Sequence, residues 1–246
     1  MDGRFCGPPG TANGGYLAGL IGGLSDTAVQ VTLRQPVPLD TDLAAWMIGD
    51  TVLVHQHDRL LVEAVASDLA LDVPAASDFD TAVEASRRYV AFDYHPFPRC
   101  FVCGTQREPG DGLRIFAGPV ADRELVASPW IPDASLADDN GPIPAAAAWA
   151  ALDCPGAYAA LLDRQPVAQV LGRIASIVSQ RVAAGECCVV IGWPIGRDGR
   201  KHHVGTALVN SAGRVCAKAR ATWFDVERGR DNQRRMSDGS QQHRRT

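Results

Sequence analysis

One carboxylate stands in the most apolar stretch of this chain. Residues 141–162 read GPIPAAAAWAALDCPGAYAALL, and Asp153 is the only charged residue among them. The pattern predicts a helix over residues 142–162 that is apolar on nearly every side and is therefore buried. Because an unpaired charge is costly in an apolar setting, a buried Asp is either held by hydrogen bonds as part of the structure or used for chemistry.

Cysteines are the other side chains that could do chemistry. Cys100 and Cys103 have the spacing of half a zinc site, and His95 and Cys6 are further candidate ligands. A lone pair of this kind is weak evidence, so we expect a buried turn of thiols, no metal and no other cofactor. Cys154 could act as a nucleophile, but no His lies near it in the sequence, which favours a packing role.

The composition limits the classes of function. The chain has 246 residues, of which 46% are hydrophobic and 21% charged, as in an ordinary globular protein. A formal net charge of -4 gives no basic surface for nucleic acid. The N-terminus lacks a signal-peptide pattern, and no apolar run is long enough to span a bilayer. We therefore expect a cytoplasmic protein with reduced cysteines.

Two parts of the chain share one order of elements, a helix followed by antiparallel strands. In the first part, a glycine-rich helix starts near Asn13, and strand patterns follow over residues 29–69. In the second part, strand patterns over residues 112–130 precede the alanine-rich helix, and four more follow over 168–225. An internal repeat of this kind largely fixes the fold.

The repeat divides the chain into two units, a connector and a tail. We expect a first unit over residues 1–75, a connector over 76–99, a second unit over 100–226 and a tail over 227–246. The connector contains the pattern of one short helix, with Thr81 and Glu84 spaced as a capping box. The tail is polar and rich in Arg, so it has little to bury and we expect it to be disordered.

Short motifs in both units resemble those of hotdog thioesterases. The run CFVCG at 100–104, followed by GLRI at 112–115, is similar to the opening of the phenylacetyl-CoA type. The glycine-rich run at 14–19 and LRQPVPL at 33–39 are similar to the double hotdog acyl-CoA thioesterases. Together the motifs cover about residues 5–226. The resemblance implies an α+β double hotdog, in which two antiparallel sheets each wrap around a central helix and are related by a pseudo-twofold axis.

The resemblance also implies where a site would lie. In single-hotdog thioesterases the central helix starts with His-Gly-Gly, a backbone amide there polarises the thioester carbonyl, and a carboxylate follows nine residues after the His. The first unit keeps this helix start as NGG at 13–15, but Gly22 stands in the place of the carboxylate. The second unit has Pro144 at its helix start and keeps the carboxylate as Asp153.

Each half retains the part that the other has lost, which implies one composite site. In this site Asp153 would be the nucleophile or general base. The amides of Gly14 and Gly15, at a helix start capped by Asn13, would form the oxyanion hole. We expect three further residues to bind the substrate in the same crevice: Tyr16, Ala146 and Trp149.

The expected function is hydrolysis of an acyl-CoA or acyl-carrier thioester. The loss of one whole site, and of the His, leaves a second class open, a non-catalytic acyl- or CoA-binding or assembly protein on a degenerate hotdog fold. The sequence is compatible with a homo-oligomer, and it leaves the oligomeric state, the acyl chain and the carrier open.

Three other sites are disfavoured. The run DDNGPIP at 138–144 resembles the Asp-x-Asn-Pro-x-His motif of hotdog hydratases but lacks its His. A serine hydrolase would need a Gly-x-Ser-x-Gly elbow, which the chain lacks. Basic residues over 197–203 could meet the phosphates of coenzyme A, although a solvated turn is the simpler interpretation.

The composition of the tail yields a first prediction. Removal of residues 227–246 should leave the protein folded, since these residues carry no apolar face. We expect a chain ending at Val226 to melt at the same temperature as the full-length protein. A clearly lower melting temperature of the shortened chain would contradict this prediction.

Overall fold

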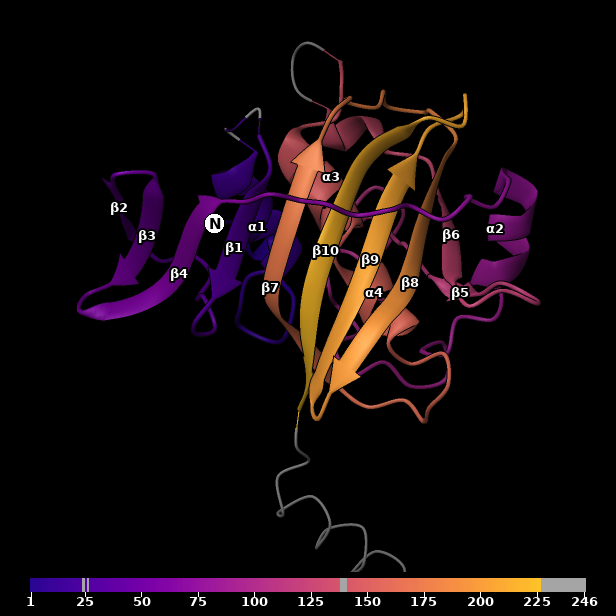
Figure 1. Ribbon diagram of the computed structural model, residues 1–246, viewed down its shortest axis with the longest axis horizontal. Helices are drawn as coiled ribbons and strands as arrows, with labels where there is room; N and C mark the ends of the chain where they lie inside the picture. The colour runs from indigo at the N-terminus through magenta and orange to yellow at the C-terminus, as the bar shows by residue number, and fades with distance from the viewer. Residues whose placement is uncertain (24, 26, 138–140, 227–246) are drawn as a thin grey trace, which may run out of the picture.

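The computed structural model describes residues 1–23, 25, 27–137 and 141–226 (Figure 1). Within these ranges, ten strands form one sheet in the order β2-β3-β4-β1-β7-β10-β9-β8-β6-β5. Each pairing between neighbouring strands is antiparallel. The predicted tail and residues 138–140 of the hydratase-like run lie outside the described residues.

The first half of the sheet follows a short 3-10 helix, η1, and the glycine-rich helix α1. The strand patterns that the sequence predicts over residues 29–69 are present as four strands. The elements are η1 (Gly3–Phe5), α1 (Gly14–Gly22), β1 (Val29–Leu33), β2 (Ala44–Ile48), β3 (Thr51–Gln56) and β4 (Arg59–Ala66).

The second half of the sheet surrounds the alanine-rich segment. A hairpin, β5 and β6, precedes this segment, and four long strands follow it. The elements after β4 are α2 (Phe79–Ser86), β5 (Gly118–Pro119), β6 (Val126–Trp130), η2 (Ala134–Leu136), α3 (Ala145–Ala151), α4 (Cys154–Ala159), β7 (Gln169–Val178), β8 (Cys188–Asp198), β9 (Lys201–Val209) and β10 (Val215–Asp225).

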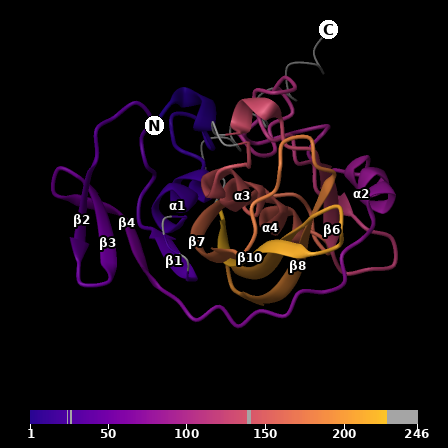
Figure 2. The ribbon, with the colours of Figure 1, turned by 90° about the horizontal axis from the view of Figure 1, so that it is seen from above.

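The two halves meet where β1 pairs with β7, with Val29 opposite Ser176 and Thr32 opposite Arg173. Outward from this seam, the four strands that follow the central helix come in the same order in each half: first, fourth, third, second. The second half then continues with β6 and β5. The sheet curves around α1, α3 and α4 on one face (Figure 2). This is the arrangement of a double hotdog with its pseudo-twofold axis between β1 and β7, as the sequence predicts.

The opposite face of the sheet is partly covered by residues 67–78, the segment between β4 and α2. Figure 1 shows the chain after β4 crossing in front of the strands to reach α2 beside β5 and β6. There Ala82 and Ala85 are buried against Val189, Ile191 and other residues of a small second apolar cluster. No helix within the described ranges is long and apolar enough to cross a membrane.

The alanine-rich segment is two helices rather than the single helix predicted over residues 142–162. Helix α3 ends with Leu152 as its C-cap, and α4 begins after Asp153, with Pro155 in its first turn. Proline lacks the N–H that would continue the ladder, and its ring disfavours helical geometry in the residue before it. The break therefore places Asp153 at a corner between two helices instead of in the middle of one.

Two further local predictions are wrong. Residues 112–117 are not a strand: Arg114 has a φ of 53°, and only the following Gly118–Pro119 pairs with β6. Helix α2 is capped by Asp78, whose side chain accepts a hydrogen bond from the Thr81 N–H at 2.7 Å. Thr81 is thus inside the helix, and the predicted capping box was placed three residues too late.

Close contact between α1 and α3 yields the second prediction. A Cβ built on Gly19 would lie 2.6 Å from Ala146 Cα and 2.7 Å from Trp149 Cβ, so neither neighbour can turn away. In Gly19→Ala, overpacking costs about 1–3 kcal/mol, and the higher helix propensity of Ala returns up to about 1 kcal/mol. We expect a net loss of about 1–2 kcal/mol in the free energy of unfolding, measured with urea.

The control for this prediction is Gly196→Ala, where a Cβ meets no heavy atom within 4 Å. This variant should remain within about 0.5 kcal/mol of the wild type. Equal stability of the Gly19 and Gly196 variants would show that α1 and α3 are not in such close contact.

Candidate active site

Asp153 is a buried carboxylate that joins the two central helices. Its Oδ2 accepts hydrogen bonds from Asn13 Nδ2 at 2.9 Å and from the Gly15 N–H at 3.0 Å. The other side-chain oxygen, Oδ1, is buried and has no hydrogen-bond partner among the described residues. Asn13 Oδ1 accepts a hydrogen bond from the Tyr16 N–H at 2.8 Å and so caps α1. The Asn13 amide is therefore held in one orientation, with its Nδ2 facing the carboxylate.

The surroundings of Asp153 shift its ionisation. Burial is the main cause, and together with the charge of the Cys100 thiolate it raises the pKa of the Asp153 carboxyl to about 7. The hydrogen bonds from Gly15 and Asn13 act in the opposite direction and favour the charged form. A carboxyl group in this range can both accept and return a proton near neutral pH.

Asp153 lies on the wall of a cavity of about 940 Å³. The N-terminus of α1 reaches this cavity through Asn13 and Gly14. None of the described residues accepts a hydrogen bond from the Gly14 N–H. Much of the remaining wall is apolar, with contributions from both halves of the chain: Leu17, Leu33, Val37, Leu161, Leu171 and Phe224.

The two glycine amides predicted as an oxyanion hole differ in this structure. The Gly15 N–H is already bonded to Asp153, and a Cβ built on Gly15 would lie 2.5 Å from Asp153 Cβ. Gly15 therefore holds the carboxylate and is not among the residues lining the cavity. Gly14 is the amide that remains available to a ligand.

The three predicted substrate-binding residues lie away from the cavity wall. Tyr16 stacks on Phe5 with ring centroids 3.9 Å apart. Ala146 and Trp149 pack against Gly19 of α1. The prediction placed Tyr16 by its nearness to the start of α1, and Ala146 and Trp149 by their nearness to Asp153 in sequence. In the structure, Tyr16 packs on aromatic rings, and the other two residues make contacts between helices.

The position related to Asp153 by the pseudo-twofold axis has neither a carboxylate nor room for one. A Cβ built on Gly22 would lie 2.7 Å from the Cη2 and Cζ2 atoms of Trp149. At the facing helix start, Pro144 makes no side-chain capping bond. The indole of Trp149 thus occupies the space beside Gly22, and the two halves of the molecule differ at this point.

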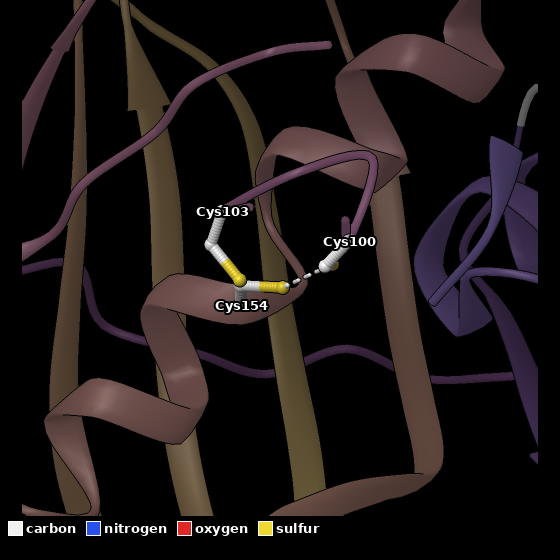
Figure 3. A group of neighbouring side chains, drawn as sticks. All are labelled: Cys100, Cys103 and Cys154. Carbon is white, nitrogen blue, oxygen red and sulfur yellow. Dashed lines mark hydrogen bonds between the residues drawn. The ribbon is translucent and has the colours of Figure 1, made fainter. Parts of the chain in front are cut away.

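Three cysteines meet on the cavity wall near Asp153. Figure 3 shows the sulfur atoms of Cys100 and Cys103, on one turn, directed toward that of Cys154 on α4. The three Sγ atoms lie within 4.8 Å of one another, and those of Cys100 and Cys154 are 3.7 Å apart. Reasoning from the sequence missed this cluster because Cys154 is distant from the other two along the chain. The nearest indication in the sequence that Cys154 occupies a special position was Pro155, which breaks the helix beside it.

Hydrogen bonds and burial shift the pKa values of the three thiols in different directions. Bonds from the Cys103 and Cys154 thiols lower the pKa of Cys100 well below its ordinary value. Burial raises the pKa of Cys103, and the bond to Cys100 raises that of Cys154. The pKa of Cys100 is therefore shifted in the opposite direction from those of Cys103 and Cys154.

A polar network continues from Cys103. His95 Nε2 lies 3.3 Å from Cys103 Sγ and 3.3 Å from Tyr158 Oη. Tyr89 Oη is within hydrogen-bond distance of both Tyr158 Oη and the Cys103 carbonyl. Cys6, considered as a ligand from the sequence, lies elsewhere and contacts the side chain of Arg107.

Comparison with solved structures shows the fold. No protein-family model and no curated protein matches the sequence. The tesB protein of Mycobacterium avium subsp. paratuberculosis is 14% identical, with a TM-score of 0.57 over 92% of this chain and 95% of that one. A hot dog fold protein of unknown function from Alicyclobacillus acidocaldarius is 13% identical, with a TM-score of 0.55 over 93% and 92%. The double hotdog fold thus extends over nearly the whole chain.

The hydrogen bond between Asn13 and Asp153 yields the third prediction. Asn13→Ala removes a helix cap, which costs about 1 kcal/mol, and it removes a donor from a buried carboxyl, which costs about 1–3 kcal/mol more. We expect a loss of roughly 2–4 kcal/mol in urea unfolding. Asp78→Ala is the matched control, because it removes only the exposed cap of α2 and should cost about 1 kcal/mol. Equal losses in the two variants would contradict a structural link between Asn13 and Asp153.

Proposed function

We propose that this chain hydrolyses an acyl-CoA or acyl-carrier thioester at one composite site between two hotdog units, residues 1–75 and 100–226. One observation supports this proposal above the others. Asp153 of the second unit is held through Oδ2 at the helix start of the first unit, and its Oδ1 has no partner. A carboxylate fixed in this way beside an apolar cavity is equipped to act on a carbonyl group.

Binding would use the two kinds of wall that the cavity offers. The acyl chain would lie against the aliphatic and aromatic residues, where removing apolar surface from water is favourable. The thioester carbonyl oxygen would accept a hydrogen bond from the Gly14 N–H at the positive end of α1. The carbonyl carbon would then face Asp153.

The reaction can follow either of two routes that leave Asp153 unchanged at the end. As a general base, Asp153 Oδ1 takes a proton from water while the water oxygen attacks the carbonyl carbon. As a nucleophile, Oδ1 attacks the carbon itself, the thiolate leaves, and water hydrolyses the resulting mixed anhydride. In both routes the C–S bond breaks, and the products are a carboxylic acid and a free thiol.

The surrounding groups would contribute to the rate in separate ways. Gly14 would stabilise the oxyanion of the tetrahedral intermediate, and one such donor contributes about 10²–10³-fold to turnover. General base catalysis contributes a further ~10²–10⁴-fold. Asn13 and Gly15 would position the carboxylate by occupying its Oδ2.

The fourth prediction concerns Asp153→Asn, which keeps the shape of the side chain and removes its charge. Turnover of an acyl-CoA, followed as release of coenzyme A by chromatography, should fall by about 10²–10⁴-fold. The affinity for a non-hydrolysable thioether analogue should stay nearly the same, because the cavity is unchanged. The control is Asp163→Asn, the same substitution at an exposed carboxylate outside the cavity, and it should have wild-type turnover.

Undiminished turnover in Asp153→Asn would remove this residue from the mechanism. A wild-type protein that binds acyl-CoAs but hydrolyses none of a series from acetyl to long-chain would instead support the alternative, a non-catalytic acyl-binding protein. Because acyl-carrier thioesters are also candidate substrates, the series should include one thioester of each kind.

A further inference from the structure

We propose that Cys100, Cys103 and Cys154 form a binding site for a thiophilic divalent metal ion, of which Zn²⁺ is the type. This goes beyond the proposed hydrolysis and does not depend on it. The sequence alone argues against a metal because a lone pair of cysteines is weak evidence, even with His95 and Cys6 as further candidate ligands. The fold supplies the third thiol from α4 and places all three sulfur atoms on the cavity wall.

The spacing of the sulfur atoms suits such an ion. In a tetrahedral zinc site with Zn–S bonds of about 2.3 Å, neighbouring sulfurs are roughly 3.8 Å apart. The Sγ atoms of Cys100 and Cys154 are 3.7 Å apart, and all three fall within 4.8 Å of one another. The three sulfurs are therefore close to the spacing that one tetrahedral ion requires.

The turn that carries two of the ligands is rigid. The Gly104 N–H donates a hydrogen bond to the Cys100 carbonyl at 2.9 Å. A Cβ built on Gly104 would lie 2.5 Å from that carbonyl oxygen and 2.7 Å from the Pro98 carbonyl oxygen, so no larger residue fits without a shift of the backbone. The side chains of Phe101 and Val102 are fully buried and anchor the turn in the core. This part of the site is therefore already ordered in the folded protein, and metal binding would not have to order it.

Donor groups surround the sulfurs and would stabilise their negative charge. The Phe97 N–H donates to His95 Nδ1 at 2.9 Å, which places the ring proton of neutral His95 on Nε2. That Nε2–H faces Cys103 Sγ at 3.3 Å, so His95 acts as a donor to the sulfur rather than as a metal ligand. Asn13 Nδ2 lies 3.9 Å from Cys100 Sγ. Hydrogen bonds from neighbouring residues to the side chains that bind a metal orient those side chains and adjust their affinity for the metal.

Three protein ligands leave the fourth position of a tetrahedral ion open. Because the three cysteines line the cavity, that position would be on the cavity side, where water or a ligand can reach it. Binding requires thiolates, so each thiol that is protonated beforehand releases its proton to solvent when the ion binds.

A disulfide between Cys100 and Cys154 is the competing fate of the cluster. It would bring the two sulfurs to about 2.05 Å, would need an oxidant to take up two electrons, and would leave Cys103 without a covalent partner. The donors directed at Cys103 and Cys100 favour thiolates over a neutral disulfide. A metal ion would bind all three cysteines, whereas a disulfide would use only two of them.

Cobalt provides the test, because Co²⁺ replaces Zn²⁺ and its thiolate complexes absorb in the near ultraviolet. The full-length protein is stripped of metal under reducing conditions and titrated with Co²⁺. We expect a thiolate-to-cobalt charge-transfer band that saturates at one ion per chain and disappears when one equivalent of Zn²⁺ is added. Absence of this band in the reduced wild-type protein would overturn the proposal.

Variants then assign the band to the cluster. Cys154→Ser removes a ligand itself and should weaken cobalt binding by more than the roughly 10–100-fold that loss of a residue supporting a ligand costs. Cys188→Ser, which alters a buried cysteine outside the cluster, should bind as the wild type does. An unchanged band in Cys154→Ser would contradict the assignment. So would a Cys100–Cys154 disulfide in protein isolated without reductant, combined with no cobalt binding after reduction. Asp153→Asn should keep the ion, so loss of thioester hydrolysis in that variant is distinguishable from failure of the metal proposal.

Discussion

The hydrogen bonds from Asn13 and Gly15 to Asp153 are the interaction on which the centre of this molecule depends. A carboxylate enclosed by apolar residues is costly unless donors are directed at it. The N-terminus of α1 supplies one side-chain and one backbone donor, and its positive end favours the negative charge. The contact also fixes the spacing of the helices, because Gly15 has no Cβ to hold Asp153 away. The two halves of the chain are thereby joined at one point beside the cavity.

The same constraint explains why two similar halves yield one site. The four strands that follow each central helix run outward from the β1–β7 seam in one order, so the fold could hold two equivalent positions. At one of them the carboxylate is present and the cavity is open. At the other, the ring of Trp149 lies against Gly22 and fills the space. The position at Asp153 is therefore held by polar contacts beside the cavity, whereas the position at Gly22 is filled by packing between the helices.

Much of the fold could be predicted from the sequence because it rests on local patterns. Alternation located the long strands of both halves, and the apolar runs located both central helices. The local failures have local causes: the run of alanines outweighed Pro155, and Asp78 was passed over in favour of Thr81. The contacts around the site were harder to predict from the sequence. Nothing in the sequence shows that Trp149 faces α1 rather than the cavity, or that Cys154 lies against a turn 54 residues earlier in the chain.

We propose that Asp153 and the start of α1 act together on one thioester carbonyl. The most direct measurement is a crystal structure of the Asp153→Asn protein with an intact acyl-CoA bound. We expect the acyl chain to lie in the apolar cavity and the thioester oxygen to lie within about 3 Å of the Gly14 N–H. We also expect the carbonyl carbon to lie beside the amide of residue 153. An acyl-CoA bound at another surface, or with its carbonyl remote from both groups, would contradict this joint action of Asp153 and α1.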